Sequence, residues 1–174
     1  MRLRTLTALA GVAALAAACG KSPSEPAANT TGAAESAAPA APAAPAAPAM
    51  APEEVAKIVS ALPAPYNTGD LAAGKLQFNK CMSCHTVAKG GPAMTGPNLY
   101  EIFGEKAGVR PGFSFSPAMK AATFTWDEAH MDQWVAKPLE MLPGTKMTFP
   151  GIKDAKQRID LITYLKVAAS GGPI

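Results

Sequence analysis

The residues best able to do chemistry are Cys81, Cys84 and His85, which stand in the order Cys-Met-Ser-Cys-His. Two thiols at this spacing can form thioethers with both vinyl groups of one haem, and the histidine beside them is then placed under the iron. We therefore predict one covalent haem c with His85 as an axial ligand. A zinc half-site or a redox disulfide are the alternatives for a CxxC pair. Zinc would need a second ligand pair, and only His130 and no cysteine follows His85.

A haem that transfers electrons needs a second axial ligand, and methionine is the choice that raises the reduction potential. The candidates are the methionines of the C-terminal part, Met82, Met94, Met119, Met131, Met141 and Met147. Met147 ends a Pro/Gly loop, residues 142–147, which can bring a thioether to the iron. Met119 and Met131 lie in helical segments, where core packing is the simpler role. We predict Met147; His130 is the competing ligand and would give a bis-histidine, lower-potential haem.

Four segments are predicted to form the helices that position these ligands. Residues 52–62 place proline and two acids in a first turn and apolar residues on one face. Asp70 can cap a helix over residues 71–80, and residues 125–128 form a capping-box pattern for a helix that Pro138 closes. The last helix is expected over about 154–170, with Asp154 as its candidate cap. No alternating strand pattern is present, so the expected fold class is all-α, with about four to five helices around one haem.

The composition divides the chain into an export region, a spacer and a domain. The aromatic residues of the 174-residue chain begin at Tyr66, so only the part beyond it can build a core. We assign residues 1–18 to a signal peptide, 19–51 to a lipid-anchor site and Ala/Pro-rich linker, 52–66 to a short helix and connector, and 67–174 to the domain. The net charge of +3 is mild, and no nucleic-acid motif is present.

The first residues are typical of an exported protein. Arg2 and Arg4 precede an apolar run, residues 6–18, that is too short to span a membrane as a helix. Small residues before Cys19 resemble a bacterial lipobox, although Ala16 stands where such boxes usually have leucine. We expect lipid modification of Cys19; ordinary cleavage is the alternative. The following Ala/Pro repeats favour an extended polyproline II spacer.

From about residue 69 to 169 the sequence resembles class I cytochromes c of the mitochondrial and bacterial c2-like branch. The matching pieces occur in order along the whole domain. They are residues 81–87, Gly90-Gly91, Gly96-Pro97-Asn98-Leu99, Ile102-Phe103-Gly104, Pro111-Gly112-Phe113-Ser114, Trp126, Pro143-Gly144-Thr145-Lys146-Met147, Gly151-Ile152 and residues 158–166.

The resemblance implies roles for further residues. Met147 matches the axial methionine, and the Pro97 carbonyl matches the acceptor of a hydrogen bond from the axial histidine. Trp126 and Thr145 match residues that bind haem propionates, and Phe149 matches an aromatic side chain at the haem edge. A crossing of the first and last helices of the domain is also implied, through Gly74, Phe78, Leu161 and Tyr164.

The sequence departs from the mitochondrial pattern at three positions of this kind. Phe115 replaces a tyrosine that bonds a propionate, and Glu105 replaces an arginine near the same group. Arg110 is a candidate substitute for that arginine. Trp134 replaces a tyrosine whose hydroxyl meets the axial sulfur, so its indole either donates there or fills volume.

The expected function is one-electron transfer, because an iron with two protein ligands has no open position for a substrate. The resemblance implies a bc1-type donor and a terminal oxidase acceptor. We expect a monomer whose docking face carries Lys80, Lys89, Lys137 and Lys146, tethered through Cys19 on the periplasmic side of a bacterial membrane. A haem peroxidase or a haem subunit of a periplasmic dehydrogenase is the alternative.

Overall fold

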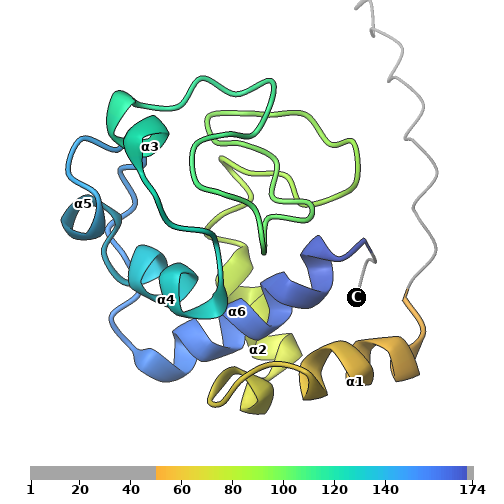
Figure 1. Ribbon diagram of the computed structural model, residues 1–174. Helices are drawn as coiled ribbons and strands as arrows, with labels where there is room; N and C mark the ends of the chain where they lie inside the picture. The colour runs from red at the N-terminus through yellow and green to blue at the C-terminus, as the bar shows by residue number, and fades with distance from the viewer. Residues whose placement is uncertain (1–49, 172–174) are drawn as a thin grey trace, which may run out of the picture. The chain divides into compact units, whose positions relative to one another are not determined.

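The computed structural model describes residues 50–171, and the predicted signal peptide, Cys19 and most of the linker lie outside this part. Six α-helices and one 3-10 turn follow one another in that range (Figure 1). They are α1 (Pro52–Ser60), η1 (Tyr66–Thr68), α2 (Leu71–Phe78), α3 (Pro117–Ala121), α4 (Glu128–Ala136), α5 (Pro138–Met141) and α6 (Ala155–Ala169). Within these residues the extended pairing is limited to one bridge, Lys106 with Thr125. The all-α prediction is therefore confirmed.

The helix count exceeds the predicted four to five because two helices are single turns. α3 spans 5 residues and α5 spans 4, and each begins with a proline. Proline at the first helical position fixes φ where its missing N–H is not needed. An element of one turn is too short to produce a helical hydrophobic period, so the sequence pattern did not separate these two turns from loops.

The close crossing of α2 and α6 is the centre of the fold (Figure 1). Gly74 faces α6, and a Cβ atom there would lie 2.1 Å from the Asp160 carbonyl oxygen and 2.6 Å from the Tyr164 Cβ. Only glycine therefore allows the two backbones to approach this closely. One turn further along α2, the Phe78 ring packs on Tyr164 with their ring centroids 5.5 Å apart.

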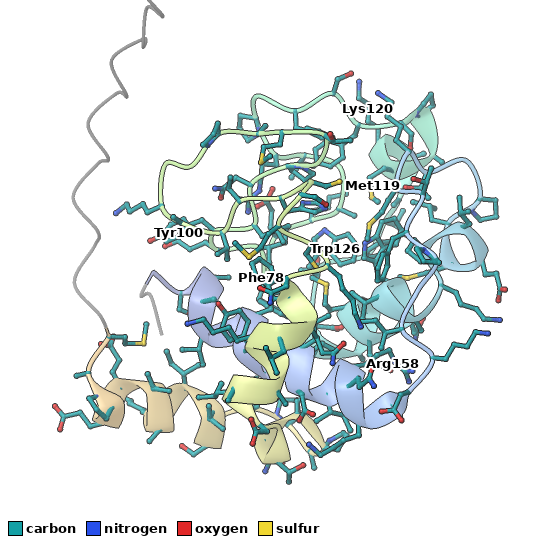
Figure 2. The ribbon with its side chains drawn as sticks, turned by 180° about the vertical axis from the view of Figure 1, so that it is seen from behind. Phe78, Tyr100, Met119, Lys120, Trp126 and Arg158 are labelled. Carbon is teal, nitrogen blue, oxygen red and sulfur yellow. The ribbon has the colours of Figure 1, made fainter. Side chains whose placement is uncertain are left out.

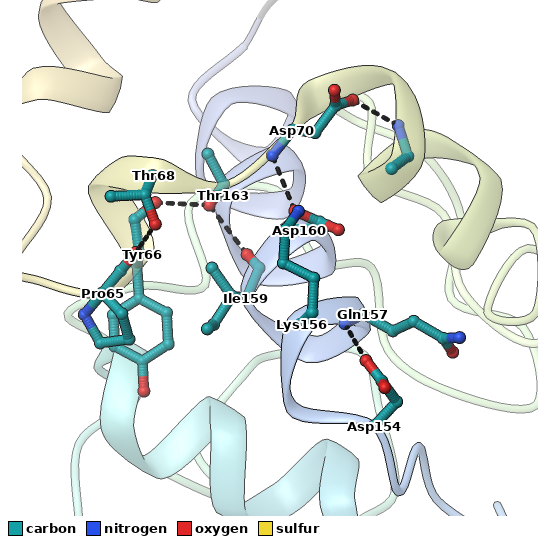
Figure 3. A network of polar contacts seen from close by, with 11 residues as sticks. Pro65, Tyr66, Thr68, Asp70, Asp154, Lys156, Gln157, Ile159, Asp160 and Thr163 are labelled. Carbon is teal, nitrogen blue, oxygen red and sulfur yellow. Dashed lines mark hydrogen bonds and ion pairs between the residues drawn. The ribbon is translucent and has the colours of Figure 1, made fainter.

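Polar side chains connect the start of α2 to α6, and two of them, Asp160 and Thr163, are buried (Figure 3). Asp70 caps α2 by accepting the Ala73 N–H at 2.7 Å, and its own N–H donates to the Asp160 carboxylate at 2.7 Å. Lys156 pairs with the same carboxylate at 2.6 Å. The fully buried Thr163 hydroxyl lies 2.6 Å from the Tyr66 carbonyl oxygen. The polar groups that this crossing removes from water are thus paired.

The start of α4 differs from the sequence prediction. Asp127 caps the helix by accepting the His130 N–H at 2.7 Å, whereas Thr125 lies before the helix in the bridge with Lys106. The predicted capping box at Thr125 was therefore wrong by two residues, because a tertiary pairing holds that segment extended. The predicted end of the helix at Pro138 agrees with the structure, in which α5 starts there.

The amphipathic helix α1 packs against α6 and η1, as its apolar stripe predicted. Leu62 just beyond it is buried, and Val55, Ile58 and Val59 are partly buried. Among residues 50–171, no helix is long and apolar enough to cross a membrane.

Candidate functional site

A cavity of about 390 Å³ lies between the end of α2, the turn that follows it, the long loop before α3, and the loop before α6. Most of its wall is apolar and aromatic. Phe78, Trp126 and Met119, labelled in Figure 2, reach this wall from α2, the segment before α4, and α3. The four residues predicted to attach the haem and ligate its iron all line it: Cys81, Cys84, His85 and Met147.

The two thiols and the imidazole lie on one tight turn directly after α2. The N–H groups of Cys84 and His85 both donate to the Cys81 carbonyl, at 3.0 and 2.9 Å. This turn holds three side chains against the cavity. Burial raises the pKa of the free Cys81 thiol to about 11, with Lys80 lowering it and Cys84 raising it by smaller amounts.

The His85 ring is held in one orientation by its surroundings. Its Nδ1 lies 2.8 Å from the Pro97 carbonyl oxygen, which can only accept, so Nδ1 carries the proton and Nε2 keeps its lone pair. Burial lowers the pKa of His85, which favours this neutral ring, and the bond to Pro97 acts in the opposite direction. A Cβ at Gly96 would lie 2.3 to 2.7 Å from three ring atoms. The glycine therefore lets the loop close over the imidazole.

Met147 reaches the cavity from a loop that is hydrogen-bonded to a second loop of the cavity wall. The Lys146 ammonium donates to the Ser114 carbonyl at 2.7 Å, and the Met147 N–H donates to the Thr145 hydroxyl at 3.3 Å. The first bond joins residues 143–150 to the loop that precedes α3, and the second lies within residues 143–150. The thioether is thereby held in the wall by a short segment without helical constraints.

Aromatic side chains form another part of the cavity wall. The rings of Trp126 and Trp134 meet edge to face with centroids 5.4 Å apart, and both residues are buried. Phe124 continues the row, 4.9 Å from Trp126, and stacks on His130. His130 itself lies outside the cavity wall and contacts the Asp127 carboxylate at 2.8 Å.

One partly buried ion pair lies in this wall. Arg110 donates through Nη2 to Glu105 and through Nη1 to the Tyr100 carbonyl at 2.6 Å. Its Nε is the one buried side-chain polar atom in residues 50–171 without a hydrogen-bond partner. An unsatisfied buried donor costs about 1–3 kcal/mol, so an acceptor is expected to belong here.

The structure places residues that were predicted separately from the sequence around one cavity. The predicted cofactor contacts Pro97, Trp126, Trp134, Thr145 and Phe149 all line the cavity. Two of the four candidate docking lysines, Lys80 and Lys146, do so as well, whereas Lys89 and Lys137 do not. Lys89 lies 5.9 Å from the Tyr100 ring centroid, and Lys137 pairs with Glu140 at 2.9 Å.

From the sequence, two residues of the wall were assigned to core packing alone. Met119 and Met131 are buried as predicted, but they border the cavity rather than only filling the core. The position of Met131 could have been predicted from its spacing to Trp134 and Val135 on α4, because residues three and four apart share a helix face.

This wall fits a haem. It offers two thiols for covalent attachment, an imidazole and a thioether for the iron, apolar side chains for the porphyrin faces, and an unpartnered guanidinium N–H for a carboxylate. Within residues 50–171, no three side chains of His, Cys, Asp and Glu gather into a group able to hold a bare metal ion.

Comparison with known proteins agrees with this geometry. The family model described as cytochrome c matches residues 71–168. Cytochrome c of Kluyveromyces lactis is 41% identical over 105 residues, covering 60% of this chain and 96% of that protein. Cytochrome c2 of Rhodomicrobium vannielii is 39% identical over 115 residues, covering 64% and 92%. The solved structure of cytochrome cH from Methylobacterium extorquens superposes with a TM-score of 0.53 at 45% identity, covering 56% of this chain and 98% of that one.

Proposed function

This chain belongs to the cytochrome c family, and we propose that it carries single electrons on one covalent haem c whose iron is ligated by His85 and Met147. The observation that supports this ligand pair is the cavity itself. His85 reaches it from the attachment turn, and Met147 reaches it from the loop before α6. The two side chains are 62 positions apart in the sequence and share one apolar site.

A bound haem would supply an iron able to cycle between Fe(III) and Fe(II), and the residues of the chain would control its surroundings. The Pro97 carbonyl keeps the proton on His85 Nδ1, so that Nε2 would be the atom that ligates the iron, with its basicity raised by this hydrogen bond. Met147 contributes a neutral sulfur, which stabilises Fe(II) relative to a histidine ligand. Trp126, Trp134 and Phe115 exclude water from the site, which keeps charge at the iron poorly solvated.

Substitution of the methionines tests the ligand assignment. Met147→Leu nearly conserves volume, and we expect loss of the thioether-to-iron charge-transfer band and appearance of a high-spin or water-ligated spectrum. Met119→Leu and Met131→Leu are matched controls, because they remove a buried thioether from the same cavity wall. Both should keep the band. An unchanged spectrum in Met147→Leu, or loss of the band in either control, would show that another residue ligates the iron.

The partners proposed for this carrier are a bc1-type complex as donor and a terminal oxidase as acceptor, docking where Lys80 and Lys146 border the cavity. Opposite charges on two docking faces mainly raise the association rate. Lys80→Glu should therefore slow second-order reduction by a purified bc1-type complex severalfold at low salt. Lys57→Glu reverses an exposed charge on α1 and serves as the control. Equal rates for the two variants would contradict this docking site.

We also propose export and tethering to the periplasmic side of a bacterial membrane through a lipid on Cys19. The support is the sequence alone: the basic start, the short apolar run and the Ala/Pro-rich spacer. A tether raises the effective concentration of the domain near membrane complexes. Intact-mass analysis of the mature protein should show an N-terminus at Cys19 with the mass of a lipid added. A mature N-terminus without lipid would leave a soluble carrier.

A further inference from the structure

We propose that Arg110 binds a haem propionate in this chain and that Glu105 positions it, so that the two residues shift the reduction potential in opposite directions. The inference rests on the proposed function, because it needs a haem in this cavity. It begins from the Arg110 Nε, which is buried and has no acceptor among the described residues.

The guanidinium is fixed by two other bonds. Nη2 donates to Glu105 and Nη1 donates to the Tyr100 carbonyl at 2.6 Å, so the group cannot turn to satisfy Nε elsewhere. The side chains of Arg110 and Glu105 are only 15% and 22% exposed. A carboxylate is the acceptor that matches a guanidinium best, and a haem brings two carboxylates into the cavity.

Arg110 differs from the other cations of the wall by its burial. Lys80, Lys106 and Lys146 also border the cavity, but all three are exposed. Exposed charges are screened by water and salt, so they act weakly on a buried group. Ser116 lies in the same wall and is buried, but its hydroxyl carries no charge, and Phe115 and Met119 beside it have no N–H or O–H donor. Arg110 is therefore the least exposed charged donor of the wall that is available to a propionate.

Glu105 holds this donor and opposes its charge. A positive charge near the haem favours the Fe(II) state, which carries one more electron, and a negative charge favours Fe(III). Arg110→Gln should therefore lower the potential, whereas Glu105→Gln should raise it. Both substitutions break the same ion pair, so a purely structural role would move the two potentials in the same direction or leave both unchanged.

The matched control is Arg158, which pairs with Asp132 at 2.8 Å through Nε and has side-chain exposures of 16% and 25% for the two partners. Arg158 lies on α6, is labelled in Figure 2, and does not border the cavity. Arg158→Gln thus removes an equally buried pair elsewhere. It should lower stability and leave the potential unchanged.

The experiment is a redox titration of the purified holoprotein and the three variants in low salt. We expect the equilibrium constant for reduction to fall on the order of tenfold in Arg110→Gln, because one poorly screened unit charge is removed near the haem. A tenfold change in this constant corresponds to about 59 mV for a one-electron couple. It should rise severalfold in Glu105→Gln. In ferrous protein, the Arg110 Nε–H should also give a resonance that exchanges slowly with water.

Several results would overturn the inference. They are potentials that shift in the same direction, a shift in Arg158→Gln as large as in Arg110→Gln, or rapid exchange of the Nε–H. If Arg110→Gln fails to incorporate haem, the other two measurements test the inference. A potential that does not rise in Glu105→Gln, or rapid exchange of the Arg110 Nε–H in the wild-type protein, would then overturn it. A wild-type protein without attached haem would overturn the proposed function too, whereas a normal haem spectrum with unshifted potentials would overturn this inference alone.

Discussion

The α2–α6 crossing can be tested by adding one methyl group at Gly74. The new Cβ would lie 2.1 Å from the Asp160 carbonyl oxygen and 2.6 Å from the Tyr164 Cβ, both closer than the 3.0 Å that real Cβ atoms keep. Neither atom belongs to the flexible end of a side chain, so the helices themselves must separate. Overpacking of this kind costs about 1–3 kcal/mol, and here the upper end applies.

The replacement also has a favourable part, because alanine is about 1 kcal/mol better than glycine inside a helix. Gly74→Ala should therefore lower the free energy of unfolding by about 2 kcal/mol, or the melting temperature by roughly 10 °C in a domain of this size. Urea unfolding of the holoprotein, followed by far-UV circular dichroism, measures this. Ala72→Ser is the control, since it adds an atom at an exposed position of the same helix and should change stability by less than about 0.5 kcal/mol. Unchanged or increased stability in Gly74→Ala would refute the close-contact reasoning.

Two further predictions concern the site and the pH dependence of folding. Gly96→Ala would place a Cβ 2.3 Å from the His85 Cε1, so the ring must move, and a denaturant titration of the visible spectrum should show ligand loss at a lower midpoint than in wild type. An unshifted midpoint would mean that the loop moves instead. The hydrogen bond from the His130 backbone N–H lowers the pKa of Asp127. The ionised carboxylate therefore stabilises the fold fully above its unfolded pKa, about 3.9, and this contribution is lost as the pH falls from there through the lower pKa of the folded state. Asp127→Asn should keep the helix cap but weaken the acid-induced loss of stability below about pH 4; an identical acid limb would contradict this.

Features carried by contiguous residues were predictable from the sequence. The attachment motif needs only the spacing of Cys81, Cys84 and His85, because covalent geometry within one turn places the three groups together. The caps of α2 and α6 were predictable for the same reason: Asp70 and Asp154 each accept an N–H three residues ahead. Resemblance to a known family supplied the expectation for Pro97, and it agreed with the choice of Met147 that its Pro/Gly loop had already favoured.

Features that depend on distant segments needed the tertiary structure. Thr125 has the residue type and spacing of a helix cap, yet its pairing with Lys106 holds it extended and Asp127 caps α4 instead. The sequence also left the role of Arg110 open. That role depends on which acceptors lie around its guanidinium once Tyr100 and Glu105 have taken two of its groups.

The sequence by itself determined that this chain attaches a haem and that its domain is helical, since both follow from local spacing and side-chain type. The tertiary structure decided which methionines border the cavity, which lysines flank it, and which buried cation has a donor left to offer. The physical reason is that a hydrogen bond or a buried charge depends on distance in space, and residues far apart in the sequence meet only when the loops between the helices have folded.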